Sequence, residues 1–177
     1  MKLKNLLIVI QRRGWLAFVS SSFYQAKYLF YKFILRSNYL TKNIYNFKMF
    51  LNLKDQGLSR TLILFGKREL DHKIILEKVL KKNMNVFDLG ANIGYYTLIQ
   101  RQLIGFNGKM TAIEPVSDNI EILKKNLILN NDTKTKVIEG AASNRSSYSN
   151  MYISDYFNLG TLNPEGSSKK FLKKKTN

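Results

Sequence analysis

The sequence contains no cysteine, and His72 is its only histidine. Disulfide bonds, thiolate catalysis and cysteine-ligated metals are therefore excluded, and so is a metal site built from several histidines. A Ser-His-Asp site would have to use His72, which stands at the start of a helical pattern and is expected to be an ordinary surface residue. We accordingly expect no metal.

Long uncharged apolar runs are also missing. The apolar run over residues 6–10 is too short for the core of a signal peptide, and Arg12 and Arg13 follow it. No stretch approaches the roughly 18 to 20 uncharged residues that a membrane-spanning helix needs. We therefore expect a cytoplasmic protein, and peripheral contact with a membrane surface stays open.

Acidic residues are missing from both ends of the chain. No Asp or Glu occurs before Asp55 or after Glu165. Residues 1–54 carry ten Lys or Arg, and the last eleven residues carry five lysines, whereas residues 55–168 carry fourteen basic and twelve acidic residues. The formal net charge of +17 therefore belongs mainly to the two ends.

Residues 1–45 combine this charge with large apolar side chains, and we expect two or three helices over residues 3–45. Basic helices with Trp, Phe and Leu suit an anionic membrane surface. The same pattern could bind an acidic substrate or nucleic acid, although the absence of a recognised binding motif makes nucleic acid the least favoured partner. A third interpretation is an accessory helix pair that packs its aromatic face on the domain. The side chains concerned are Trp15, Phe18, Phe23, Tyr24, Tyr28, Leu29, Phe30, Tyr31, Phe33, Ile34 and Leu35.

Beyond residue 45 the hydrophobic pattern predicts an α/β fold. A short strand is expected over residues 46–53, and residues 59–65 fit either a helix or a strand. Helices and strands then alternate, which implies right-handed βαβ units and a parallel sheet. The predicted helices cover residues 71–82 and 93–103, with a third that starts at a capping box of Asp118 and Glu121; the predicted strands cover residues 85–89, 109–113 and 136–142.

Chemistry is concentrated where the first of these strands ends. Asp88 closes the apolar strand, and Gly90, Ala91, Asn92 and Gly94 form a glycine loop before the next helix. Glu114 follows twenty residues after Gly94, at the tip of the second strand. This spacing is typical of a nucleotide-type cofactor pocket at the carboxyl edge of a parallel sheet.

The residues of this loop favour S-adenosylmethionine over a dinucleotide. The third glycine of the dinucleotide fingerprint would fall at Tyr95, and Asp88 would repel a pyrophosphate. S-adenosylmethionine carries an ammonium, a sulfonium and no phosphate. Asp88 would face the ammonium, and Glu114 would accept hydrogen bonds from the ribose diol through both oxygens. Glu139 and Ala141, at the tip of the third strand, would flank the adenine.

The sequence then resembles a known family. Residues 88–97 (Asp-Leu-Gly-Ala-Asn-Ile-Gly-Tyr-Tyr-Thr), residues 112–115 with Asn119, and residues 141–143 look like the FkbM family of class I S-adenosylmethionine-dependent methyltransferases. The resemblance covers roughly residues 45–164. It implies a Rossmann-like parallel sheet and O-methylation of a sugar, a glycan or a secondary metabolite.

The chain also departs from that family. The family pattern continues with a fourth parallel strand carrying an acidic segment beside the transferred methyl group, and no such segment follows here. The sheet is therefore expected to be incomplete at its carboxyl-terminal side, with its first strand as an open edge that a partner or a second copy would cover. No catalytic base is apparent. The alternative is therefore a truncated, non-catalytic remnant or cofactor-binding module, which could associate with the membrane surface through its basic amino-terminal helices.

These expectations divide the chain into three parts. Residues 1–45 form the basic, aromatic-rich helical segment, and residues 46–166 form the partial cofactor-binding domain. Residues 167–177 are expected to be a disordered lysine-rich tail, preceded by a short strand over 150–154 that pairs with residues 160–164 as a hairpin.

Overall fold

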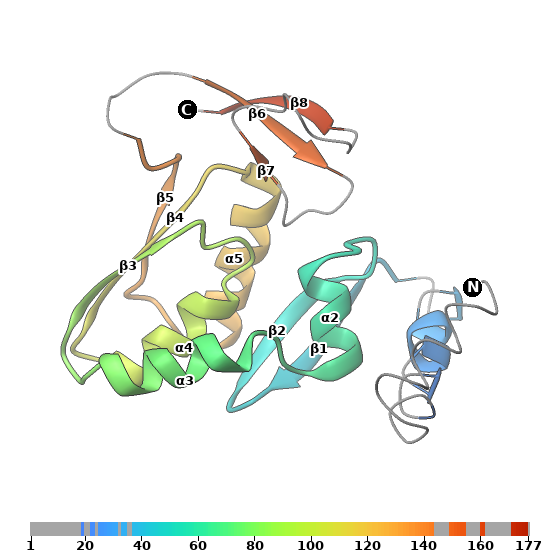
Figure 1. Cartoon of the computed structure of the whole chain (residues 1–177), viewed down its shortest axis with the longest axis horizontal. Coiled ribbons are helices and arrows are strands. Elements are labelled where there is room, and N and C mark those ends of the chain that lie inside the picture. The colour runs from blue at the N-terminus through green and yellow to red at the C-terminus, as the bar shows by residue number, and fades with distance from the viewer. Residues whose placement is uncertain are drawn as a thin grey trace.

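The computed structural model describes residues 19, 22–23, 25–31, 33–34, 37–143, 149–154, 160–161 and 171–176. Three small sheets follow one another along the chain: a hairpin, a parallel sheet with helices, and an antiparallel sheet formed by the last strands (Figure 1). The class is mixed α/β, as the sequence predicts.

The parallel sheet is built from β3 (Asn85–Leu89), β4 (Lys109–Glu114) and β5 (Lys136–Glu139), in that order. Helix α4 (Tyr95–Ile104) joins β3 to β4, and α5 (Ser117–Leu129) joins β4 to β5. Helix α3 (Leu70–Val79) precedes β3 and packs against α4. The predicted βαβ units are therefore confirmed.

The two faces of this sheet differ sharply. On one face Met110 and Ala112 are buried in the core. On the other, Phe87 and Leu89 are 67% and 60% exposed. Among the described residues β3 pairs only with β4, so the open edge that the sequence predicts is present. That a partner or a second copy covers it stays a prediction.

The first sheet is a hairpin of β1 (Tyr39–Ile44) and β2 (Phe47–Asn52). The helical prediction for residues 3–45 is therefore wrong over 39–44. Ile44 is buried in the core while its neighbour Asn43 is exposed, which is the alternation of a strand with one buried face. The strand conformation of these residues is stabilised by their pairing with β2. The described residues between 19 and 33 are helical, and Tyr28 packs on the hairpin, donating its hydroxyl to the Leu53 carbonyl at 2.6 Å.

The aromatic residues of that helical segment divide between core and surface. Tyr28 is buried, as the packing interpretation expects. Phe23, Phe30 and Phe33 are instead 68%, 52% and 66% exposed. The described helices include none that is both long enough and apolar enough to cross a membrane.

The outer edge of β2 is closed by side chains in place of a further strand. The amides of Lys48 and Phe50 donate to the carboxamide oxygens of Asn130 and Asn126, at 2.9 and 2.6 Å, and the same carboxamides donate back to the Lys48 and Phe50 carbonyls. The spacings match, because four helical residues rise about 6 Å and two strand residues about 6.6 Å. A third outward amide, that of Asn52, donates to the Ser59 hydroxyl at 3.3 Å.

Helix α2 (Leu58–Phe65) resolves the stretch that fits either structure in sequence. Buried Asp55 accepts the amides of Gly57 and Ser59 at its amino end, both at 2.7 Å. At its carboxyl end the Lys42 ammonium donates to the Leu62 and Ile63 carbonyls. The negative charge at the amino end and the positive charge at the carboxyl end both interact favourably with the helix dipole. Burial, with a smaller contribution from Lys27, lowers the pKa of Lys42.

Helix α5 begins differently from the sequence prediction. Its amino-terminal cap is Val116, and no side chain caps it there, so the capping box of Asp118 and Glu121 is not formed. Its buried stripe consists of Ile120, Leu123 and Leu127.

The last sheet corrects the prediction for the tail. Strand β6 (Ser149–Ser154) pairs with β7 (Gly160–Thr161), which confirms the predicted hairpin. Residues 171–176, expected to be disordered, form β8 (Phe171–Thr176) on the other edge of β6. Lysines disfavour strands locally, so pairing with a distant strand decides the conformation.

We predict that Asn126→Ala lowers the free energy of unfolding by about 3 kcal/mol, because it leaves buried backbone groups of β2 without partners. Asn130→Ala removes the same type of paired bond from the surface end of the edge, and should cost less than about 1 kcal/mol. Urea unfolding of both variants measures the difference. Equal losses would show that the buried carboxamide has no special role.

Candidate functional site

The backbone amides of the loop between β3 and α4 are all hydrogen-bonded within the protein. Gly90 and Ala91 both donate to the Ile113 carbonyl, at 2.9 and 3.0 Å. Asn92 donates to Glu114 Oε2 at 2.8 Å, Ile93 to the Asn92 side chain, and Gly94 to the Ala91 carbonyl. All five amides of residues 90–94 therefore have partners within the protein.

The two glycines of the loop are needed for different reasons. Both have positive φ, +77° at Gly90 and +91° at Gly94. A Cβ on Gly90 would meet nothing within 4 Å, so the loop faces open space there. A Cβ on Gly94 would lie 2.6 Å from Leu123 Cδ1, so this glycine lets α5 pack directly on the loop.

Asp88 lies beneath the start of α4. Its carboxyl is buried and accepts a hydrogen bond of 2.6 Å from the Thr97 hydroxyl. Burial raises its pKa above the usual range, and the Thr97 hydrogen bond and the charge of His72 offset part of that rise. A buried carboxylate with one neutral donor favours a cation beside it.

Glu114 holds the loop from the tip of β4. It is 4% exposed. Its Oε2 accepts the Asn92 amide, and its Oε1 accepts both the Val116 amide at 3.1 Å and the Asn119 carboxamide at 3.0 Å. Oε1 therefore has both acceptor positions filled, and in this arrangement a ribose diol could reach only Oε2.

Glu139 and Ala141 lie on the neighbouring strand end. Glu139 pairs in register with Glu114, and its exposed carboxylate accepts the Ser117 hydroxyl at 2.9 Å. Ala141 is exposed just beyond it. The fold thus brings the eight predicted cofactor residues to one edge of the parallel sheet, and their contact with a cofactor stays a prediction.

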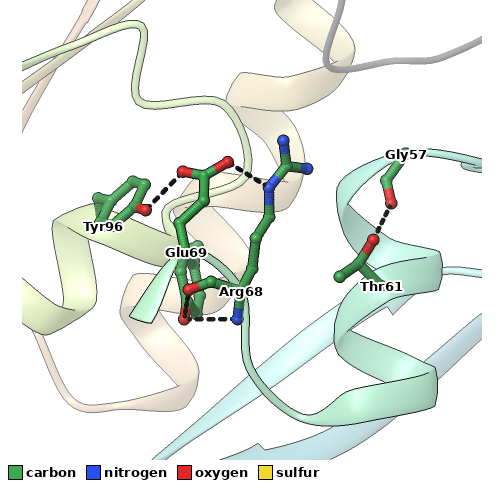
Figure 2. A network of polar contacts seen from close by, with 6 residues as sticks. Gly57, Thr61, Arg68, Glu69 and Tyr96 are labelled. Carbon is green, nitrogen blue, oxygen red and sulfur yellow. Dashed lines mark hydrogen bonds and ion pairs between the residues drawn. The ribbon is translucent and has the colours of Figure 1, made fainter. Parts of the chain in front are cut away.

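A second group of polar residues lies where the start of α3 meets the start of α4, and the sequence analysis did not assign it to the site. Glu69 accepts Arg68 Nε at 2.7 Å and the Tyr96 hydroxyl at 2.6 Å (Figure 2). The His72 ring lies 4.6 Å from the Tyr96 ring, centroid to centroid. Tyr95 is a buried packing residue, with its hydroxyl bonded to the Arg68 backbone.

This group holds an uncommon backbone conformation. Glu69 has φ +47° and ψ +59°, the left-handed region that costs a residue with a Cβ about 1–2 kcal/mol. The conformation aims its carboxylate at both Arg68 and Tyr96, whose bonds offset the cost. The only signal in the sequence is the proximity of two tyrosines to the glycine loop, which does not identify their partners.

Other features of the described part lie elsewhere or are absent. Cavities of about 310 and 490 Å³ share Asn46, Phe47, Asn130 and Asn131 in their walls. They lie near the loops that enter the strands, so they are at the opposite edge from Asp88 and Glu114. Within the described ranges no three acidic, histidine or cysteine residues gather as a metal site would require.

No family model matches the chain, and no curated protein matches it by sequence. Several solved structures share its fold in part. They include TYW2 of P. horikoshii in complex with MeSAdo (19% identity, 62% of this chain and 39% of that one, TM-score 0.48). Another is the SAM-dependent methyltransferase of Agrobacterium tumefaciens (12%, 58% and 32%, TM-score 0.45). A third is Methanocaldococcus jannaschii Trm5 in complex with adenosine (21%, 59% and 30%, TM-score 0.43). The chain spans less than half the length of each.

We predict that Asp88→Asn raises the melting temperature at pH 7. The folded-state pKa of Asp88 lies above its unfolded value, so ionisation costs stability once the pH exceeds the folded pKa. Asparagine cannot ionise and can still accept the Thr97 hydrogen bond. The advantage should shrink as the pH falls and disappear below about 3, where the aspartate is protonated in both states. Thermal melts from about pH 3 to 8 measure it, with the exposed Glu121→Gln as control; a lower melting temperature at pH 7 would contradict it.

We also predict that Gly94→Ala destabilises the protein more than Gly90→Ala. Both substitutions force alanine into the left-handed region at about 1–2 kcal/mol. Only Gly94→Ala also drives a methyl group into Leu123, adding about 1–3 kcal/mol. Urea unfolding of the two variants checks this prediction. Equal losses in the free energy of unfolding would contradict it, because they would mean that Leu123 and α5 move aside without cost.

Proposed function

We propose that this chain binds S-adenosylmethionine at the carboxyl edge of its parallel sheet and functions as a methyltransferase of the FkbM type. The observation that carries the proposal is that all five amides of residues 90–94 are engaged within the protein. A pyrophosphate binds such loops through free amides, so these amides do not offer a phosphate site.

The charges at this edge support a cationic ligand without phosphate. Asp88 and Glu114 are both buried carboxylates beside the loop, and Glu139 is a third acidic group one strand away. The ammonium of S-adenosylmethionine would neutralise Asp88. Open space at Gly90 admits the methionine portion, and Glu114 Oε2 and Glu139 are the acceptors that remain for the ribose and adenine.

When bound, S-adenosylmethionine supplies an electrophilic methyl group. The protein's own residues orient it: the loop fixes the approach of the methionine end, and β4 and β5 fix the adenosine end. The acceptor class, a hydroxyl of a sugar, glycan or secondary metabolite, rests on the resemblance of residues 88–97 and 112–115 to that family.

We predict that the purified chain binds S-adenosylmethionine and S-adenosylhomocysteine in isothermal titration calorimetry. Asp88→Asn should weaken both affinities at least tenfold, because the ligand ammonium loses its charged partner. Glu121→Gln removes a surface carboxylate from α5 and should change them less than twofold. Equal affinities in the wild type and Asp88→Asn would contradict the assignment of Asp88.

Transfer of a radiolabelled methyl group separates the enzyme from a non-catalytic binding module. Label entering an oligosaccharide or glycoside pool supports the proposed acceptor class. Label entering tRNA instead would contradict that class while retaining the methyltransferase. Binding without transfer to any pool would favour the binding module.

A further inference from the structure

The polar group where the starts of α3 and α4 meet has no role in the proposed function, although it adjoins the cofactor loop. It consists of Arg68, Glu69, His72 and Tyr96, and we call it the His72 cluster. Tyr96 immediately precedes Thr97, the residue that bonds Asp88, and the His72 ring contacts the Tyr96 ring in a tilted arrangement, with an interplanar angle of 45° and centroids 4.6 Å apart. The cluster is thus connected to Asp88 through two consecutive residues of one helix.

The charge of His72 acts on both acidic neighbours. It lowers the pKa of Asp88 and also that of Glu69, so the imidazole lies within electrostatic reach of each carboxyl. In the proposed complex Asp88 marks the methionine end of the cofactor, whereas Glu114 and Glu139 mark the adenosine end. The sulfonium belongs to the methionine end, and that end is on the side of the His72 cluster.

The members of the cluster differ in their capacity to take a proton. Burial, then the hydrogen bond to Glu69, raises the pKa of Tyr96, so its hydroxyl stays protonated at neutral pH. Hydrogen bonds from Tyr96 and then Arg68 lower the pKa of Glu69, which makes that carboxylate a weak base. Histidine is the side-chain type that exchanges protons near neutral pH.

We propose, resting on the function proposed above, that the sulfonium of S-adenosylmethionine binds beside His72 and that the acceptor hydroxyl enters between them. In the transfer step the hydroxyl oxygen forms a bond to the methyl carbon. The bond from that carbon to sulfur breaks, and its electron pair stays on sulfur, giving S-adenosylhomocysteine. The hydroxyl proton passes to the His72 imidazole. Tyr96 and Glu69 are positioning residues that hold the ring in place.

The single histidine makes this position directly measurable. S-adenosylmethionine and S-adenosylhomocysteine differ at sulfur by a methyl group and one positive charge. Proton NMR of the His72 imidazole, titrated with pH in each complex, reads that charge through the space between the two groups. Tyr96 contacts the ring, Asp88 and Glu69 interact with it electrostatically, and Arg68 pairs with Glu69. Asp71 and Lys73 are its neighbours on α3. All these groups are present in both complexes, so their effects cancel in the comparison.

We expect the pKa of His72 to be lower with S-adenosylmethionine than with S-adenosylhomocysteine by about half a unit or more, the effect of a unit charge roughly 8 Å away. Equal values in the two complexes would overturn the inference while leaving cofactor binding intact. If neither ligand bound, the proposed function would fail, and this inference with it.

Binding measurements on His72→Gln provide an independent check. By reciprocity, the wild-type ratio of the two affinities should shift about threefold or more in favour of S-adenosylmethionine as the pH rises through the titration of His72. In His72→Gln this component of the pH dependence should disappear. Lys73→Gln, one residue along the same helix, should retain it. A pH dependence identical in all three proteins would overturn the inference.

Discussion

A single buried carboxamide, that of Asn126, joins three parts of the fold. It bonds both backbone groups of Phe50 in the hairpin, and it donates to the Ile93 carbonyl of the glycine loop at 2.8 Å. Because Asn126 is fully buried, none of these bonds can be exchanged for water without opening the core. The position of the loop relative to the hairpin therefore depends on one side chain of α5.

The loop itself is held from two directions. Glu114 fixes the Asn92 amide from the tip of β4, and Leu123 packs against Gly94 from α5. These contacts fill the donors that another ligand class would use, and among the described residues no lysine or arginine forms an ion pair with Asp88, Glu114 or Glu139. The proposed preference for a cationic cofactor thus follows from how the loop is stabilised as well as from which residues it contains.

The sequence predicts the parallel sheet well because its signals are local. Apolar runs such as residues 85–89, followed by glycine, identify the strand and its end within a residue or two. The sequence analysis missed β1 and β8. β1 becomes a strand by pairing with the adjacent β2, and β8 by pairing with the more distant β6. In the site, the motif identifies Asp88 and the glycines, but the two hydrogen bonds that fill Glu114 Oε1 depend on distances between β4 and the start of α5. The His72 cluster depends on the left-handed backbone conformation of Glu69, which the sequence does not predict because glutamate rarely adopts it.

The amides on the outer edge of β2 have an unusual consequence for hydrogen exchange. An edge strand normally exchanges its outward amides with solvent, whereas those of Lys48, Phe50 and Asn52 are held by side chains of α5 and α2. Their exchange reports the detachment of those helices and not the parting of two strands. Since Asn126 also binds the loop, a ligand that orders the loop would slow deuterium uptake at Phe50. The hairpin would thereby record events at a site more than forty residues further along the chain.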